Sequence, residues 1–340
     1  MRIALFAETF LPKLDGVTQT ICRLLDHLAL RGHQTVMFAP EGAPAQYAET
    51  PIIGLPSLSM PLYPELHLAP PTLGIEPRLW AFRPELIHAV NPALLGLSGL
   101  HLAEKWGIPL VASYHTDLPG YAERYGLGLL REPLWAYFRW LHNHADLNLC
   151  PSRFTLRDLE AHGFQRVRLW PHGVDTTRFN PAHASAAWRE RLSGGHPEAP
   201  LLLYVGRLAV EKRLDWLRPL PDACPQARLA IVGDGPERAQ LESLFAGTPT
   251  VLTGYLTGDD LSAAYASADV FVFPSASETF GNVVLEAMAS RLPVLAPDAG
   301  GQVDLVTHGY NGLLFEQNDP HQFAACAQRL LHDANLRESL

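Results

Sequence analysis

Short apolar segments of strand length recur along the whole chain, and each is followed by turn residues and a longer stretch with helical spacing. In the first half these segments are 2–7, 34–39, 51–55, 86–89, 110–114 and 147–150, and in the second half LLLYVG, RLAIVG, TVLTGY, DVFVFPS, PVLAPD and GLLFE repeat the pattern. Continuous apolar strands separated by helices are typical of parallel sheets covered on both faces. The sequence therefore predicts an α/β protein with two Rossmann-like, doubly wound units in tandem.

Chain length also favours two domains, because one hydrophobic core rarely grows beyond about 250–300 residues and this chain has 340. We expect domains over residues 1–170 and 199–340, joined by a linker region, 171–198, that is rich in Pro, Ala, Ser and Gly. Open α/β sheets bind ligands at the carboxyl ends of their strands. We therefore expect the two domains to face each other across a cleft that holds the ligand-binding site. The proline-rich segment 57–84 shows no periodicity and is expected to be a long functional or mobile loop.

Charge and cysteine usage exclude several classes of protein. The formal charge is −9, from 26 basic and 35 acidic side chains, which argues against a nucleic-acid partner. The four cysteines include no C-x-x-C pair, so neither a zinc site nor a disulfide framework is indicated and a reducing cytosol fits best. The N-terminus enters the first strand directly, and no apolar stretch approaches 18 residues. We therefore expect a cytoplasmic protein without a cleaved signal or a membrane-spanning segment.

The most informative run, Glu278-Thr279-Phe280-Gly281-Asn282-Val283-Val284-Leu285-Glu286, follows a predicted strand and indicates a loop that opens a helix. A helix that begins near Gly281 or Asn282 would direct its first N–H groups at an anion such as a diphosphate. Glu278 and Glu286 would then accept hydrogen bonds from sugar hydroxyls. On spacing alone, two solvated surface glutamates are the commoner explanation. The strand–loop–glycine–helix setting favours a site that binds a diphosphate and a sugar over this explanation.

A second run, Gly206-Arg207-Leu208-Ala209-Val210-Glu211-Lys212, comes directly after the strand LLLYV. Arg207 can bind a phosphate with two parallel hydrogen bonds and Lys212 adds a compact charge, so together they can stabilise a leaving diphosphate without a metal. Lys212 is one of three lysines against 23 arginines, which favours a site that needs a compact point donor. The alternative is a surface ion pair between Lys212 and Glu211.

A third run, Ser113 to Tyr121, closes a strand of the first half and contains His115 and Asp117. This histidine could act as a base, as a metal ligand or as a group that orients a substrate hydroxyl. Near the N-terminus, Gly16 joins the first strand to the first helix and leaves room for a phosphate or a sugar to approach the backbone.

Missing motifs narrow the function further. No G-x-G-x-x-G occurs, since Gly233-Asp234-Gly235 lacks the third glycine, and no G-x-x-x-x-G-K occurs, which disfavours a dehydrogenase or a P-loop NTPase. No D-x-D occurs either, so a metal site for a diphosphate is not indicated. The phosphate charge must then be met by Arg207, Lys212 and the helix N-terminus.

The stretch 129–144 has helical spacing and is rich in aromatic and basic residues: Trp135, Tyr137, Phe138, Trp140, Arg131 and Arg139. Such a stripe usually packs on a core. The alternative is an interfacial face that meets a lipid surface. Residues 1–170 carry 14 basic and 15 acidic side chains, whereas residues 171–340 carry 12 and 20. An anionic lipid surface would therefore repel the first half much less than the second, which favours membrane contact through the first half.

Together these runs resemble the retaining GT-B glycosyltransferases of family 4 over nearly the whole chain. E-T-F-G-N-V-V-L-E is similar to that family's E-x7-E motif and G-R-L-A-V-E-K to its phosphate-binding segment. W-P-H-G-V-D-T-T-R-F is similar to its interdomain stretch, with His172 in place of the usual Asn. A-E-T-F-L-P-K-L-D-G-V and Y-H-T-D-L-P-G-Y-A-E-R-Y-G-L-G resemble the lipid-glycosylating subgroup, which includes bacterial mannosyltransferases and sulfoquinovosyl-diacylglycerol synthases.

The resemblance implies transfer of a hexose from a UDP- or GDP-linked donor to a lipid or glycolipid hydroxyl, with retention and with neither a metal nor an enzyme nucleophile. The N-terminal domain would bind the acceptor at the inner face of the membrane, and the C-terminal domain would bind the nucleotide sugar, with no other cofactor. The residues implied at the donor are Gly16, Arg207, Lys212, Gly233, Phe280, Gly281, Asn282, Val283 and Glu286. Those implied nearest the reaction are His115 and Glu278 as catalytic residues, with Asp117 and Tyr121 on the acceptor side.

Family members usually continue past the last strand with a helix that crosses back onto the N-terminal domain, whereas here a single helix, 320–332, is expected before Leu340. Two other functions stay open. One is a different enzyme on the same architecture, an epimerase or a polysaccharide synthase, and the other is a non-catalytic sugar sensor. The complete pair of phosphate and E-x7-E motifs disfavours the epimerase, the Y-H-T-D-L-P-G-Y segment disfavours the polysaccharide synthase, and the lack of a signal peptide disfavours the sensor.

Overall fold

The computed structural model describes residues 1–340 except residues 14, 61–62 and 71–73. The chain forms two compact units, residues 1–171 (the first unit) and 172–340 (the second unit). Each unit contains a mostly parallel sheet with its own hydrophobic core. The predicted α/β class with two doubly wound sheets is confirmed.

The sheet of the first unit has the strand order β10-β9-β8-β7-β1-β2-β4-β3 and is parallel except for the β3–β4 pair at one edge. Its strands are β1 (Arg2–Ala7), β2 (Gln34–Pro40), β3 (Gln46–Tyr47), β4 (Thr50–Leu55), β7 (Leu86–Val90), β8 (Leu110–Ser113), β9 (Leu147–Cys150) and β10 (Val167–Leu169). The central strand β1 is buried along almost its whole length, as expected for a strand covered on both faces. The strand order reverses between β1 and β7, which is where open α/β sheets bind ligands.

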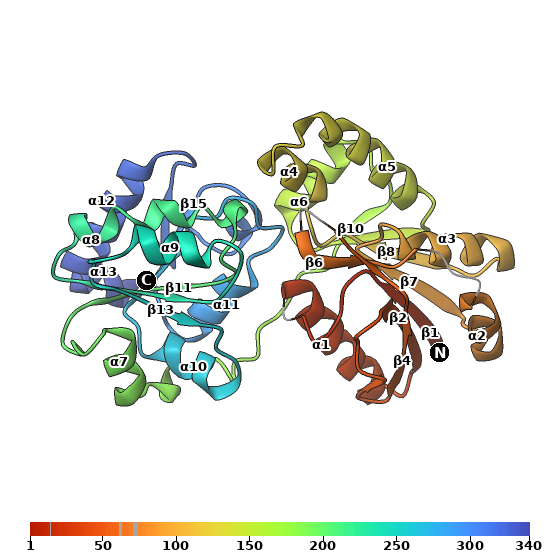
Figure 1. Cartoon of the computed structure of the whole chain (residues 1–340), viewed down its shortest axis with the longest axis horizontal. Helices are drawn as coiled ribbons and strands as arrows, with labels where there is room; N and C mark the ends of the chain where they lie inside the picture. The colour runs from red at the N-terminus through yellow and green to blue at the C-terminus, as the bar shows by residue number, and fades with distance from the viewer. Residues whose placement is uncertain (14, 61–62, 71–73) are drawn as a thin grey trace. The chain divides into compact units, whose positions relative to one another are not determined.

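The helices of the first unit are α1 (Gly16–Leu30), α2 (Ile75–Phe82), α3 (Leu95–Trp106), α4 (Leu118–Arg124), α5 (Arg131–Asn143) and α6 (Arg153–Ala161). Helix α1 begins at Gly16 because the Asp15 carboxylate accepts a hydrogen bond from the Thr18 backbone N–H at 2.8 Å. Helices α1 and α3 lie on opposite sides of the sheet (Figure 1).

The second unit has a fully parallel six-stranded sheet in the order β13-β12-β11-β14-β15-β16. Its strands are β11 (Leu201–Val205), β12 (Arg228–Val232), β13 (Thr250–Gly254), β14 (Val270–Val272), β15 (Val294–Pro297) and β16 (Gly312–Phe315). Its helices are α7 (Ala186–Leu192), α8 (Leu220–Ala223), α9 (Arg238–Leu244), α10 (Gly258–Ala266), α11 (Asn282–Ala289), α12 (Pro320–His332) and α13 (Ala334–Ser339). Here the strand order reverses between β11 and β14, so the loops after these two strands leave the sheet side by side.

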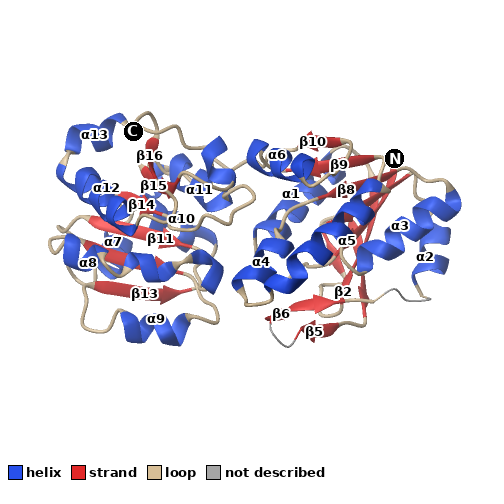
Figure 2. Cartoon of the chain, turned by 90° about the horizontal axis from the view of Figure 1, so that it is seen from above, coloured by secondary structure: helices blue, strands red, loops and turns tan. Residues whose placement is uncertain are grey.

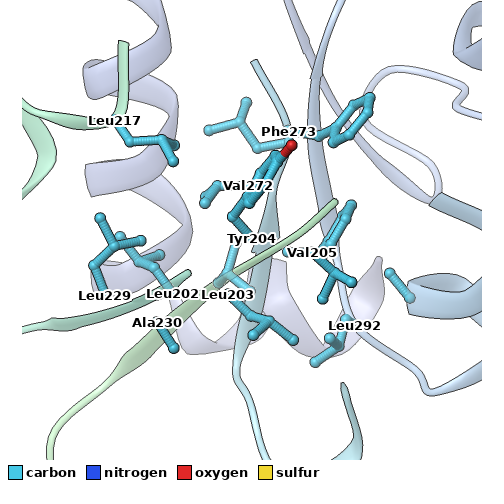
Figure 3. Close-up of a cluster of buried hydrophobic side chains, with 14 of the residues drawn as sticks. Leu202, Leu203, Tyr204, Val205, Leu217, Leu229, Ala230, Val272, Phe273 and Leu292 are labelled. Atoms are coloured by element: carbon cyan, nitrogen blue, oxygen red, sulfur yellow. The ribbon is translucent and has the colours of Figure 1, made fainter. Parts of the chain in front are cut away.

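The core of the second unit fixes the position of those loops. Strand β11 is buried along its whole length, and the Tyr204 ring stacks on Phe273, which follows β14, with ring centroids 6.1 Å apart. Figure 3 shows the side chains of β11 packed among apolar residues from both neighbouring strands and from the turn before α8. The run 206–212, which follows β11 directly, therefore starts from a strand that is packed on all sides.

Three segments differ from the sequence-based expectations. The segment 57–84 is not an irregular loop: it contains an antiparallel hairpin of β5 (Leu58–Met60) and β6 (Tyr63–Leu68), separate from the main sheet, and helix α2 (Figure 2); residues 61–62 and 71–73 of this segment lie outside the described residues. The expected linker 171–198 folds onto the second unit from residue 172, where Phe179 and Leu192 are buried in its core. Helix α12 is followed by the short helix α13, so the expectation of a single last helix was wrong.

Candidate active site

The loops after β11 and β14 meet through a carboxylate–ammonium pair. Lys212 Nζ donates to Glu278 Oε1, and the two side chains are only 13% and 19% exposed. Burial alone would lower the pKa of Lys212, but the neighbouring Glu278, Tyr204 and Glu211 raise it above its usual value. Lys212 is therefore a positive charge in a largely desolvated place, where its attraction to an anion is stronger than in water.

The second cation of this run is also paired. Arg207 Nη1 lies 3.5 Å from Glu211 Oε1, and the Glu211 side chain is almost completely buried. Glu211 is further tied to the neighbouring loop, because its backbone carbonyl accepts a hydrogen bond from Ser277 Oγ at 3.1 Å. The surface pair of Lys212 with Glu211 that the sequence left open is thus not the principal pairing, since Glu211 lies beside Arg207 and Lys212 beside Glu278.

The close approach of two backbone segments explains why residue 233, one of the predicted site residues, is a glycine. A Cβ atom at Gly233 would lie 1.9 Å from the carbonyl oxygen of Gly206, the residue before Arg207. Gly206 N in turn donates to the Val232 carbonyl at 3.0 Å. Gly233 therefore lets the loop after β12 pass directly against the run 206–212, and this close approach accounts for the residue type without a ligand.

Helix α11 begins at Asn282, as the sequence predicted, with Gly281 in the left-handed region at φ 99°. The side chain of Asn282 is hydrogen-bonded to His172 Nδ1 at 3.0 Å, and the His172 ring lies 4.8 Å from the buried Phe280 ring. Val283 is half-buried against the core. The unusual histidine of the W-P-H-G-V-D stretch thus packs on the start of α11.

Glu286 lies one turn into α11 and is buried. Its Oε2 accepts a hydrogen bond from the Tyr265 hydroxyl at 3.0 Å. Burial raises the pKa of Tyr265 well above its usual value, and the Glu286 carboxylate raises it further. Tyr265 therefore stays protonated and donates to Glu286, a partner that periodicity and spacing did not reveal.

Sequence reasoning also missed the turn on which the Glu278 loop rests. The backbone of Gly301, which follows β15, donates to the Glu278 carbonyl oxygen at 2.6 Å. Gln302 is fully buried and donates through Nε2 to the Ser275 carbonyl at 2.8 Å. Two consecutive glycines after a predicted strand were the signal that could have found this turn.

In the first unit, His115 follows β8 and is buried. Its Nε2 is hydrogen-bonded to Ser113 Oγ at 2.9 Å, and Ser113 Oγ is also 2.9 Å from His88 Nε2. The Asn91 side chain accepts hydrogen bonds from the backbone N–H groups of His115 and Thr116 at 3.1 and 3.0 Å. His115 is thus held by its ring and by its backbone.

The predicted acceptor-side residues lie on the next element. Asp117 Oδ1 accepts a hydrogen bond from the Gly120 N–H at 2.9 Å and caps α4, and Tyr121 lies half-buried within that helix. The Asp117 carboxylate thus caps α4, whereas the His115 ring is hydrogen-bonded to Ser113. Gly16 is the first residue of α1, next to Asp15, which forms an ion pair with Lys13 at 3.1 Å.

Among the described residues, no group of three or more His, Cys, Asp or Glu side chains is arranged to hold a metal ion. No helix in the described part of the chain is long and apolar enough to cross a membrane.

Two family models match most of the chain: "Glycosyltransferase Family 4" matches residues 14–178 and "Glycosyl transferases group 1" matches residues 199–333. The sulfoquinovosyl transferase SQD2 of Arabidopsis thaliana is 42% identical over 99% of this chain and 68% of its own length. The chain belongs to the family 4 glycosyltransferases. It is a glycosyltransferase enzyme.

Two other relatives of this family 4 glycosyltransferase are informative. A GDP-mannose-dependent α-mannosyltransferase of Mycobacterium tuberculosis is 41% identical over 98% of this chain and 89% of its own length. An α-monoglucosyldiacylglycerol synthase of Streptococcus pneumoniae is 28% identical over 87% of this chain and 71% of its own length.

Solved structures show that the family 4 chain has the GT-B fold. The sucrose-phosphate synthase of Thermosynechococcus elongatus superposes with a TM-score of 0.83 at 23% identity, covering 99% of this chain and 91% of that one. The HepE protein of Anabaena superposes with a TM-score of 0.79 at 20% identity, covering 100% and 92%. At these identities the likeness concerns the fold alone.

Proposed function

We propose that this glycosyltransferase moves a hexose from a UDP- or GDP-linked donor to a hydroxyl of a lipid or glycolipid, with retention of configuration. The observation that carries the proposal is the meeting of Lys212 and Glu278 where the strand order of the second unit reverses. One loop brings cations that suit a diphosphate, and the other brings a carboxylate that suits sugar hydroxyls. Glu286, with one oxygen held by Tyr265, lies one turn further along α11 and suits a ribose.

The charges of the second unit support a donor site that works without a metal. Arg207 and Lys212 supply two positive charges, and α11 begins at Asn282 between them and Glu286. The backbone of Phe280 to Val283 offers N–H groups at that helix start to phosphate oxygens. A leaving diphosphate can then be stabilised by these groups as its charge develops.

The proposed chemistry needs no enzyme nucleophile. The acceptor hydroxyl oxygen attacks the anomeric carbon from the side on which the diphosphate leaves. The bond from the anomeric carbon to the phosphate oxygen breaks, and the hydroxyl proton passes to that phosphate oxygen. The products are a glycoside with the donor's anomeric configuration and a nucleoside diphosphate. In this scheme Glu278 and His115 orient the donor sugar, and Gly16 contacts the diphosphate through its backbone.

The relatives' names support the donor and the acceptor. GDP-mannose appears in the name of the mycobacterial relative and diacylglycerol in that of the streptococcal one. The first unit also presents exposed apolar side chains that suit a lipid surface. Leu129, in the turn before α5, is 96% exposed, Trp140 on α5 is 48% exposed, and Arg139 lies beside Trp140 in the helix. We therefore propose peripheral contact with the inner face of a membrane through this side of the first unit.

A nucleotide panel in thermal denaturation tests the donor site. UDP or GDP should stabilise the protein by about 2.7 kcal/mol at a hundredfold excess over its dissociation constant. The matching nucleoside monophosphate should stabilise it less, because it lacks the second phosphate that Lys212 is proposed to hold. A flat response to every nucleoside diphosphate would contradict the proposal.

A further inference from the structure

The loop that carries Glu278 is seated on a turn that lies more than twenty residues later in the chain. Gly301 donates its backbone N–H to the Glu278 carbonyl oxygen at 2.6 Å. A Cβ atom at position 301 would lie 2.3 Å from the Thr279 carbonyl oxygen and 2.4 Å from the Phe280 nitrogen. The backbone of the turn therefore touches the backbone of the loop, with no room for a side chain between them.

A chain of hydrogen bonds runs from this turn to the Glu278 carboxylate. The Gln302 side chain is fully buried, and its Nε2 donates to the Ser275 carbonyl at 2.8 Å. Ser275, also fully buried, donates through Oγ to Glu278 Oε1 at 3.2 Å. The same carboxylate oxygen accepts from Lys212. Gln302 is thus two hydrogen bonds away from the carboxylate that faces the diphosphate-binding cation.

Buried hydrogen bonds of this kind fix both the position and the orientation of the side chains that make them. The Gln302 amide holds the backbone of Ser275 at its carbonyl, and from that backbone the Ser275 hydroxyl is aimed at Glu278. A carboxylate displaced by about 1 Å from its working position loses much of its effect on a reacting group. A buried amide that spans two loops is a structural means to prevent that displacement.

We propose that Gln302 is a positioning residue for Glu278 and acts through Ser275, while Gly301 holds the same loop through its backbone. The proposal rests on the proposed function, because Glu278 meets a donor sugar only there. The Gln302 amide donates to the backbone of Ser275, whereas the Glu286 carboxylate accepts from Tyr265 and Arg207 lies beside Glu211.

The test replaces Gln302 by Met, which keeps the volume and removes the amide. We expect kcat to fall about 3- to 10-fold, the loss typical of one hydrogen bond, while the dissociation constant of UDP or GDP stays within about twofold of wild type. The matched control is Gln328→Met. Gln328, on α12, likewise donates through Nε2 to a backbone carbonyl, that of Ala223 at 2.6 Å, away from both loops. An equal loss of kcat in the control would show that Gln302 acts only on general stability and would overturn the proposal.

A double-mutant cycle tests the route through Glu278. In a Glu278→Gln background, Gln302→Met should cost less than about twofold, because the group it positions has already been changed. An unchanged factor in that background would overturn the proposal. Ser275→Ala removes a single hydroxyl and should behave like Gln302→Met in the same cycle, which keeps the test available if Gln302→Met folds poorly. A wild type that releases no nucleoside diphosphate from any donor would instead contradict the proposed function, and this is seen before any variant is made.

Discussion

Both cations proposed to hold the diphosphate, Arg207 and Lys212, are paired with carboxylates of the chain itself. Glu211 and Glu278 therefore neutralise a pair of charges that would otherwise be costly to keep in a partly desolvated place. A bound diphosphate would share these cations with the two carboxylates. The Lys212 side chain is mostly buried, so its removal should affect the stability of the fold as well as ligand binding.

Lys212→Ala should weaken UDP or GDP binding about 10- to 100-fold, because a charge-assisted contact contributes roughly 1.5–3 kcal/mol. It should also lower the unfolding temperature, since Glu278 loses its partner. Calorimetric titration at a temperature where the variant is folded measures the first effect. The control is Lys105→Ala, which removes a lysine paired with the exposed Glu76 on the first unit. Equal affinity in wild type and Lys212→Ala would show that the pair with Glu278 is only structural.

Glu8 is a second residue whose charge is costly. It is 4% exposed, and its Oε1 accepts hydrogen bonds from the backbone N–H groups of Ala93 and Gly96 at 2.7 and 2.9 Å, beside the start of α3. Burial raises the pKa of Glu8 above its ordinary 4.5, and the backbone hydrogen bonds only partly oppose this. The folded state thus holds the proton more tightly than the unfolded state, so this residue's contribution to stability falls as pH rises above 4.5.

Glu8→Gln should therefore become more stable relative to wild type as pH rises, because Gln keeps the acceptor oxygen and carries no charge. Urea unfolding at pH 5 and pH 8 measures the difference. Glu85→Gln is the control, since Glu85 lies at the surface beside Arg2. A difference between Glu8→Gln and wild type that stays constant with pH would contradict the proposed cost of the buried charge.

At the scale of elements, the aromatic side chains of helix α5 divide between the two interpretations that the sequence left open, packing on a core and contact with a lipid surface. Trp135 is 3% exposed and packs between the His162 ring, 3.8 Å away, and Phe164, 5.9 Å away. Trp140, five residues later, is exposed to solvent, and its ring packs against the His144 ring. The aromatic stripe is thus core on one face and surface on the other, and a variant that replaces both tryptophans would mix two effects.

Trp135→Ser should lower the free energy of unfolding by about 3–5 kcal/mol, the usual cost of emptying a buried tryptophan site. Trp140→Ser should leave the unfolding free energy within about 0.5 kcal/mol and weaken binding to anionic liposomes. Chemical denaturation and liposome sedimentation give the two values for each variant. Wild-type protein that ignores liposomes, or Trp140→Ser that binds them as well as wild type does, would show that α5 has no lipid-facing side.

Much of the fold was predictable because most strands of the two main sheets are continuous apolar runs followed by turn residues. The exceptions have physical reasons: β3 and β10 have only two and three residues, and β5 and β6 form a separate hairpin without a continuous apolar run. The sequence also predicted correctly that Arg207 and Lys212 follow β11 and that Glu278 follows β14. Their partners were not predictable, because Lys212 meets Glu278 and Gln302 meets Ser275 only through strand order, which local patterns do not encode.

At the scale of the whole molecule, the two units have separate hydrophobic cores, and the first unit also buries titratable histidines. In the first unit, burial lowers the pKa of His88 and of His142 to about 4. Both histidines are neutral in the folded state, whereas the unfolded chain takes up protons below about pH 6.5. Their contribution to stability is therefore present above pH 6.5 and lost as pH falls toward 4, by an amount on the order of 3 kcal/mol for each histidine.

His142→Phe should consequently lose less stability on acidification than wild type does. Urea unfolding at pH 7 and pH 5, followed through a signal from the first unit, measures the two losses. His196→Phe, at an exposed position of the second unit, should lose as much as wild type. Parallel losses in all three proteins would show that the buried His142 does not set the acid sensitivity of the first unit.

The most direct test of the account is a transfer reaction. The wild-type chain is incubated with UDP- and GDP-hexoses and with diacylglycerol or a monoglycosyl lipid in mixed micelles containing EDTA. Lipid products are identified by mass spectrometry, and the anomeric configuration is read from the one-bond carbon–proton coupling at the anomeric carbon of the new linkage. The account predicts that one α-linked donor yields an α-linked glycolipid and the free nucleoside diphosphate, with no added metal. A product of inverted configuration, an absolute need for a divalent cation, or tight donor binding without transfer to any lipid would contradict it.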